Sequence, residues 1–238
     1  MNSIYIKIFI VALFLPLLIT GCDLSSIEDY EPEEVLTKVK ENMENNNNYQ
    51  FSVQSSAQDN GAGVNVSLRG VEIFADDMMY LIGEIGSNRV EFYKRDTDRF
   101  IKRDASEEWT DIKEYGDKRI ISLISGPSHF KTLIDKGEYE IMEDFALVQD
   151  EQTLVISGSL KDEYIIEYLE TINFLSTDQK EDLSKKDNFI VGVSFYINEQ
   201  IELQKLEVFV NSESGKKSLL KEIEVLDKNV EIDLDISN

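Results

Sequence analysis

Few side chains in this sequence could carry out nucleophilic or metal chemistry. Its 238 residues contain one cysteine, Cys22, and one histidine, His129. A catalytic cysteine needs a base beside it, and a zinc site needs several thiolate or imidazole ligands. One cysteine and one histidine cannot supply either set, so no catalytic residue and no metal ligand is assigned. His129 is expected to be an ordinary surface residue or a buried one with a hydrogen-bond partner.

Cys22 follows a short apolar segment, which predicts another kind of chemistry. The run IFIVALFLPLLI, residues 8–19, is preceded by one basic residue, Lys7. A membrane-spanning helix takes about 20 apolar residues, so this shorter run is typical of the core of a secretion signal. The next two residues, Thr20 and Gly21, are small, as a signal cleavage site requires. Together these features predict a cleaved signal peptide over residues 1–21.

The sequence Ile19-Thr20-Gly21-Cys22 resembles the lipobox of bacterial lipoproteins. The resemblance implies cleavage between Gly21 and Cys22 and attachment of a diacylglyceryl group to the Cys22 thiol. Two or three acyl chains hold a protein on a bilayer almost permanently, because each buried methylene contributes about 0.8 kcal/mol. We therefore expect a lipid anchor on the outer, extracytoplasmic face of the cell membrane, with residues 22–32 as an acidic tether.

The chain is strongly acidic, with 47 Asp and Glu against 24 Lys and Arg and a formal charge of −23. This excess excludes nucleic acid as a main partner and disfavours broad contact with an anionic bilayer. It favours solubility, with a cation-binding surface as the alternative. The sequence has no calcium loop, glycine-rich phosphate loop, serine nucleophile elbow or metalloprotease helix, so no cofactor is expected.

Hydrophobic periodicity predicts an opening helix followed by a series of strands. Apolar residues recur at helical spacing over residues 33–45, after Pro32, and the run Asn45–Asn48 ends the pattern. The period then changes to two, and the turn QDNGAG separates two alternating segments. The first six strands are expected at 49–56, 64–70, 78–83, 89–94, 99–103 and 109–114.

The middle of the chain returns to helical spacing before more strands follow. Residues 119–137 predict two short helices separated at Gly126-Pro127, because proline cannot continue a helix. Residues 162–175 predict another helix. Further strands are expected at 139–148, 153–160, 188–197, 201–210 and 218–226, with 230–236 as a candidate extension. The pattern predicts about ten antiparallel strands and three helical segments in a single domain over residues 33–238.

Two segments resemble those of proteins with the half-open barrel of the LolA and LppX type, a fold shared with uncharacterised Gram-positive lipoproteins. They are EPEEVLTKVKENMENNNNYQFSVQ and EFYKRDTDRFIKRDASEEWTDI. The resemblance implies an α+β fold in which one curved antiparallel sheet carries helices on its concave side. It also implies that a lipid or acyl chain could enter between the sheet and the helices. No binding residue is transferred from the resemblance.

The function expected from these features is non-catalytic binding of a lipid or another apolar ligand. Apolar residues on one face of the first hairpin, Phe51, Val53, Val66 and Leu68, are the candidates to line the groove. The alternative is an envelope interaction or assembly module whose barrel is filled by its own helices. An enzyme that uses a pair of carboxylates would leave no local motif, so this third class stays open. No protein partner is indicated.

Overall fold

The computed structural model describes residues 31–59, 61–103, 108–114, 119–135, 142–150, 153–172, 174 and 189–232. The residues from Pro32 to Asn238 belong to one compact unit. The signal peptide over 1–21, the cleavage between Gly21 and Cys22, and the acylation of Cys22 fall outside the described residues. These three features therefore stay predictions.

The secondary structure follows the predicted order along the chain. The helical segments are α2 (Pro32–Glu44), η3 (Ile112–Glu114), α3 (Arg119–Leu123), α4 (Ser128–Asp135) and α5 (Asp162–Thr171). The first strands are β1 (Asn48–Asp59), β2 (Ala62–Ile73), β3 (Met78–Ile85), β4 (Asn88–Arg95), β5 (Asp98–Arg103) and β6 (Thr110–Asp111). The remaining strands are β7 (Met142–Asp150), β8 (Thr153–Leu160), β9 (Phe189–Asn198), β10 (Leu203–Ser212) and β11 (Lys217–Lys228).

All the described strands belong to one antiparallel sheet, in the order β6-β5-β4-β3-β2-β1-β11-β10-β9-β8-β7. The sheet consists of two meanders, which join where the first strand, β1, pairs with the last, β11. In that pair Ser55 lies opposite Lys221 and Val53 opposite Ile223. The two ends of the folded unit therefore form the middle of the sheet, whereas the segment between the meanders supplies α3 and α4.

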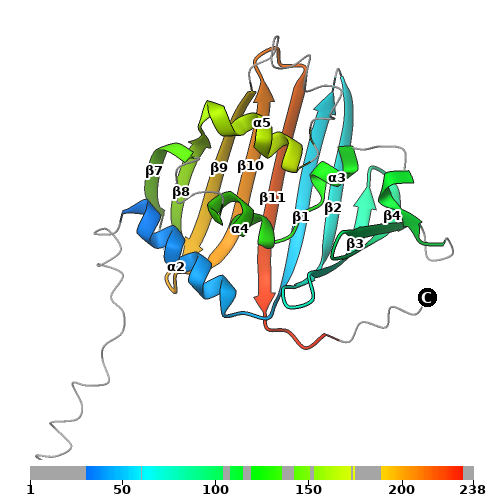
Figure 1. Ribbon diagram of the computed structural model, residues 1–238, viewed down its shortest axis with the longest axis horizontal. Coiled ribbons are helices and arrows are strands. Elements are labelled where there is room, and N and C mark those ends of the chain that lie inside the picture. Colours follow the sequence, from blue (N-terminus) through cyan, green and yellow to red (C-terminus); the bar gives the residue numbers. More distant parts are fainter. Residues whose placement is uncertain are drawn as a thin grey trace, which may run out of the picture. The chain divides into compact units, whose positions relative to one another are not determined.

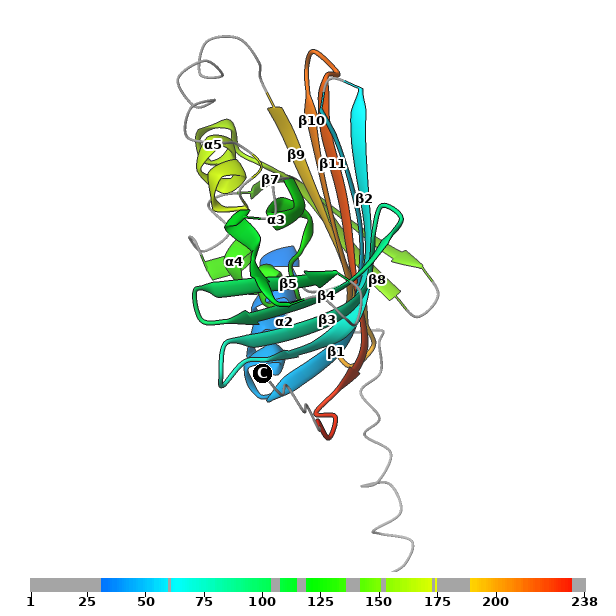
Figure 2. The same ribbon diagram turned by 90° about the vertical axis from the view of Figure 1, so that its right-hand side faces the viewer.

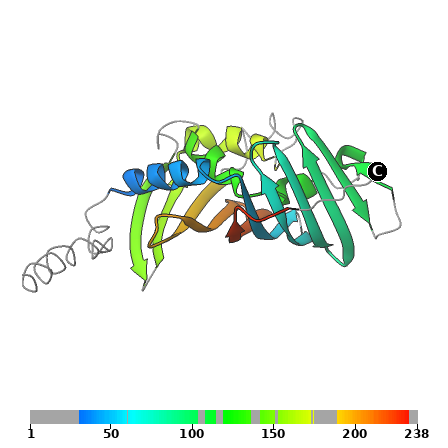
Figure 3. The ribbon, with the colours of Figure 1, turned by 90° about the horizontal axis from the view of Figure 1, so that it is seen from below.

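The helices cover one face of the sheet, and the sheet curves around them (Figures 1 and 3). Helix α2 buries Val35, Leu36, Val39 and Met43, the residues at helical spacing. The alternating strand residues point their apolar side chains toward the helices, and Phe51, Val53, Leu206 and Ile223 are among those with no exposed area. The predicted α+β class, with helices on the concave side of a single curved sheet, is confirmed.

Two glycines allow β2 and β3 to approach each other unusually closely. A Cβ atom on Gly70 would lie 1.9 Å from the carbonyl oxygen of Tyr80, and one on Gly83 would lie 2.0 Å from that of Ser67. Neither position can hold a larger residue without separating the strands. In the curved sheet, β3, β4 and β5 run across the direction of β9, β10 and β11 (Figure 2).

The structure refines two of the expected elements. The segment predicted as a strand at 109–114 forms only the two-residue β6 and then the 3-10 turn η3. The candidate extension at 230–236 has no strand over 230–232, and the rest of it lies outside the described residues. The predicted interruption at Gly126-Pro127 is confirmed, because α3 ends at Leu123 and α4 begins at Ser128.

Candidate functional site

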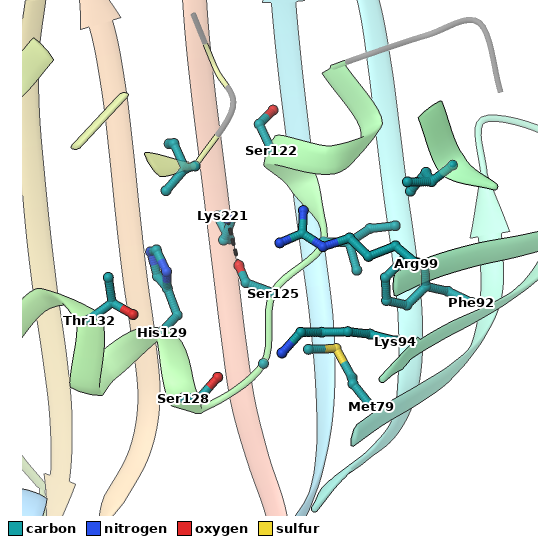
Figure 4. Close-up of a pocket in the computed structure, with 14 residues that line it drawn as sticks. Met79, Phe92, Lys94, Arg99, Ser122, Ser125, Ser128, His129, Thr132 and Lys221 are labelled. Carbon is teal, nitrogen blue, oxygen red and sulfur yellow. Dashed lines mark hydrogen bonds between the residues drawn. The ribbon is translucent and has the colours of Figure 1, made fainter. Parts of the chain in front are cut away.

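A pocket with a volume of about 190 Å³ lies on the concave side of the sheet, between β3–β5 and the α3–α4 segment (Figure 4). We call it the concave pocket. Its apolar lining residues are Met79, Phe92, Ile112, Ile124 and Ile172, and Gly126 also lines it. Its polar lining residues are four hydroxyl side chains and four basic ones: Ser122, Ser125, Ser128, Thr132, Lys94, Arg99, His129 and Lys221.

The loop between α3 and α4 is held against the sheet by a buried carboxylate. Glu72, on β2, is only 3% exposed and accepts a 2.8 Å hydrogen bond from the backbone N–H of Ser128 and another from its hydroxyl. It therefore caps the first turn of α4, where a negative charge is favourable. Burial raises the pKa of Glu72, and the two donors of Ser128 act against that rise. A Cβ atom on Gly126 would lie 2.5 Å from the Glu72 Oε2 atom, so a larger residue here would have to displace that carboxylate.

Lys221 lies in the middle of the sheet and points into the pocket. It belongs to β11, is 1% exposed, and donates a 2.6 Å hydrogen bond from Nζ to the Ser125 Oγ atom (Figure 4). Burial lowers the pKa of Lys221 to about 7, because the charged ammonium loses its hydration. Near neutral pH this side chain is therefore only partly protonated.

His129 forms the wall beside Lys221 and links two helices. It is 7% exposed, and its Nε2 atom lies 2.9 Å from the hydroxyl oxygen of Tyr168 on α5. Burial and the nearby Lys221 both lower the pKa of His129 well below its usual value, so the imidazole is neutral at pH 7. The expectation of a hydrogen-bonded histidine is met, and its place in the pocket wall is a new observation.

Two further cations reach the pocket from the neighbouring strands. The side chains of Lys94 on β4 and Arg99 on β5 extend toward Ser125 and the α3–α4 loop (Figure 4). Lys94 also forms an ion pair with Asp77, and its side chain keeps an exposed fraction of 18%. No Asp or Glu is among the residues that line the pocket. The charge of the pocket lining is therefore opposite in sign to the net charge of the chain, which has about twice as many acidic as basic residues.

The four residues predicted to line a groove lie deeper than expected. Phe51 and Val53 have no exposed area, Val66 is 3% exposed and Leu68 is 2% exposed. They form part of the sheet against which α3 packs, and a hydrogen bond of 2.9 Å from Ser55 Oγ to the Leu123 carbonyl oxygen fixes that helix. None of the four lines the concave pocket. Their contact with a ligand stays a prediction.

Val66 does line a second hollow, with a volume of about 440 Å³. This hollow is more open and lies at β1, β2, β3 and β11. Its lining is mostly polar and includes two acidic residues, Glu84 and Glu222, with Leu220 as the other large apolar residue. It has neither the apolar wall nor the basic side chains of the concave pocket, and we regard it as a surface depression.

Sequence reasoning missed the polar residues of the concave pocket, although one signal for Lys221 was present. In the strand KSLLKEIEVLDK, Lys221 stands between Leu219 and Ile223 on the alternating face that is buried. A lysine at an inward position of a strand is unusual, because lysine is rarely buried without a reason. Ser125 and Arg99 carry no such signal, since their approach to Lys221 depends on how distant strands and helices pack.

Within the part of the chain that the structure describes, no group of His, Cys, Asp and Glu is arranged to hold a metal ion. No helix of that part is long and apolar enough to cross a membrane.

Comparison with known proteins identifies the fold. No protein-family model matches the chain, and no curated protein sequence matches it. Among solved structures, the lipoprotein LppX of Mycobacterium tuberculosis superposes with a TM-score of 0.52 at 11% identity, covering 86% of this chain and 100% of LppX. The chain therefore has the LppX type of half-open barrel, as its sequence resemblance implied.

Two other solved structures are similar at a lower level. A putative outer membrane lipoprotein-sorting protein domain from Vibrio parahaemolyticus gives a TM-score of 0.31 at 11% identity, over 84% of this chain and 93% of its own. A LolA superfamily protein from Nitrosomonas europaea gives a TM-score of 0.33 at 7% identity, over 87% of this chain and 96% of its own. The identification of the fold rests on LppX alone.

Proposed function

We propose that this chain is a lipid-anchored, non-catalytic binding protein that holds an apolar or amphipathic ligand in the concave pocket. The observation that carries the proposal is the mixed lining of that pocket, in which five apolar side chains stand beside four hydroxyl and four basic ones. Binding sites for small molecules typically combine an apolar wall with a few convergent polar groups. The lipobox-like sequence ending at Cys22 supports the anchor.

The size of the pocket limits what it can hold. Ligand pockets usually measure about 300–1,000 Å³, and the concave pocket, at about 190 Å³, is smaller. It suits the polar head and first few carbons of an amphipathic molecule, with the remaining chain outside the pocket or in space opened by movement of the α3–α4 segment.

A second candidate function is supported by the buried state of the sheet. Phe51, Val53, Val66 and Leu68 are already covered by the protein's own side chains. A barrel filled in this way suits an envelope interaction module that takes no small ligand. We favour the binding protein because an interaction module has no need of Lys221, a buried lysine whose desolvation destabilises the fold.

Native mass spectrometry of the full chain, purified from its own host, tests the choice between the two functions. The binding protein should carry an additional mass that organic solvent removes. Ile124→Phe adds volume at the pocket wall and should reduce that occupancy several-fold. Ile82→Phe, at a residue that is 39% exposed, is the matched control and should leave occupancy unchanged. A chain that carries no additional mass and binds no amphipathic probe would support the interaction module.

A further inference from the structure

Lys221 is a buried amine, only partly charged near neutral pH, and no carboxylate forms a salt bridge with it within the described ranges. Its Nζ atom donates a hydrogen bond to a neutral partner, the Ser125 hydroxyl. A buried ammonium is normally compensated by a paired negative group. The compensating charge can therefore come from a molecule that enters the pocket.

Arg99 is a second basic side chain at the pocket, on the wall opposite Lys221. It lines the same pocket and extends toward Ser125, and it forms no ion pair with a described residue (Figure 4). Guanidinium groups bind carboxylate and phosphate oxygens through paired hydrogen bonds. Lys94 lies beside Arg99, and its charge is already partly compensated by an ion pair with Asp77.

One acidic group near the pocket, Glu72, would repel an anion bound there, and its contacts show how strongly. The carboxylate of Glu72 lies behind Gly126 and Ser128 and accepts both hydrogen bonds from Ser128. It does not line the pocket, and burial raises its pKa, which reduces its negative charge. Two cationic side chains, Lys94 and Arg99, and the partly charged amine of Lys221 therefore face the pocket against one shielded carboxylate behind it.

We infer that the ligand of the concave pocket is an anionic amphipath, whose phosphate or carboxylate head binds between Lys221, Ser125 and Arg99. This inference rests on the proposed function and specifies its ligand class. The Ser125 hydroxyl lies 2.6 Å from the Lys221 Nζ atom and can donate a second hydrogen bond to the same head group. The carbons next to the head then contact the apolar wall at Ile124. An incoming anion favours the charged form of Lys221 and raises its pKa.

The experiment compares probes that share an eight-carbon chain and differ in the head group. Binding of octyl phosphate, octanol, octylammonium and inorganic phosphate to the full chain is measured by isothermal titration calorimetry at pH 7. Octyl phosphate should bind at least tenfold more tightly than octanol and inorganic phosphate, and octylammonium should bind most weakly.

Two variants and one control locate the site. Lys221→Met and Arg99→Gln should each reduce octyl phosphate affinity about tenfold or more, while octanol affinity changes less than twofold in either variant. Lys216→Met removes one positive charge at an exposed position in the β10–β11 turn and should leave both affinities unchanged. Circular dichroism confirms that each variant is folded, and Arg99→Gln provides the test if Lys221→Met is not.

Each alternative outcome separates the inference from the function on which it rests. Equal affinity for octyl phosphate and octanol would overturn the anionic head while leaving an apolar binding protein. Equal affinity for octyl phosphate and inorganic phosphate would overturn the amphipath and indicate a site for free anions. If no probe binds, both the inference and the proposed binding function are wrong.

Discussion

Replacing Lys221 by methionine should make the protein more stable at neutral pH. Methionine has a similar length and shape but no charge, so it removes the desolvation of a side chain that is 1% exposed. The pKa of Lys221 falls from 10.5 in the unfolded chain to about 7 in the folded one. Protonation of the unfolded chain then disfavours folding by about 4 kcal/mol at pH 7.

The loss of the hydrogen bond to Ser125 offsets part of this gain. A buried hydroxyl left with one partner fewer costs about 1 kcal/mol. The net expectation for Lys221→Met is therefore a rise of about 3 kcal/mol in the free energy of unfolding at pH 7, within the range found when buried charges are replaced by apolar groups.

The sign of the pH dependence gives an independent check. Between pH 7 and 10.5 the unfolded chain binds more protons at Lys221 than the folded chain, so stability rises with pH. From pH 7 to pH 9.5 the unfavourable effect of Lys221 on the free energy of unfolding should become smaller by about 3 kcal/mol. The difference in stability between Lys221→Met and the wild type should therefore shrink to about zero by pH 9.5. Taking this difference cancels the titration of other groups, including Glu72 and the tyrosines.

Urea unfolding of both proteins at pH 7.0, 8.0, 9.0 and 9.5, followed by tryptophan fluorescence and circular dichroism, measures these values. Lys216→Met is the control and should match the wild type at every pH. A variant that is less stable than the wild type at pH 7, with a constant difference up to pH 9.5, would refute the reasoning. It would mean that Lys221 is already compensated in the ligand-free protein.

Three further predictions concern other parts of the chain. Gly126→Ala should lower the free energy of unfolding by about 1–3 kcal/mol, since its Cβ atom would lie 2.5 Å from Glu72 Oε2 and 3.0 Å from Phe51 Cζ. Equal urea midpoints for the variant and the wild type would contradict this packing. Below pH 6.5 the free energy of unfolding of the wild type should fall, relative to that of His129→Gln, by up to about 1.4 kcal/mol per pH unit. The reason is that the unfolded chain protonates His129, whereas burial keeps the imidazole of the folded chain neutral. Parallel stability curves from pH 7 to pH 5 would show that His129 is charged in the folded state. Cys22→Ala should leave the precursor uncut after Gly21 and without lipid, as mass spectrometry of the membrane fraction can establish; an acylated, membrane-bound variant would rule out the lipobox interpretation.

Most of the fold could be predicted from local patterns in the sequence. Alternation of apolar residues located the strands, and Gly126-Pro127 located the break between α3 and α4, because both signals act within a few residues. The curved sheet with helices on its concave side followed from the resemblance to LolA and LppX proteins. The 3-10 turn at Ile112–Glu114 was missed, since six residues of alternating pattern do not distinguish a strand from a turn.

The pocket could not be predicted because it depends on contacts between distant parts of the chain. Lys221 and Ser125 are brought together only when β11 pairs with β1 and the α3–α4 segment folds across that pair. Arg99 joins them because the curvature of the sheet turns β5 across the direction of β11 (Figure 2). Phe51 and Leu68 were expected to line a groove, which stays a prediction; their burial depends on how closely α3 packs, which no local pattern encodes.

The most direct test of the binding account is a crystal structure of the full chain with octyl phosphate. The account predicts that phosphate oxygens lie within about 3 Å of Lys221 Nζ and Ser125 Oγ, as hydrogen bonds require. The guanidinium of Arg99 should contact the same phosphate, and the first carbons of the chain should lie against Ile124. A phosphate bound elsewhere on the protein, with the concave pocket closed by its own side chains, would contradict the account.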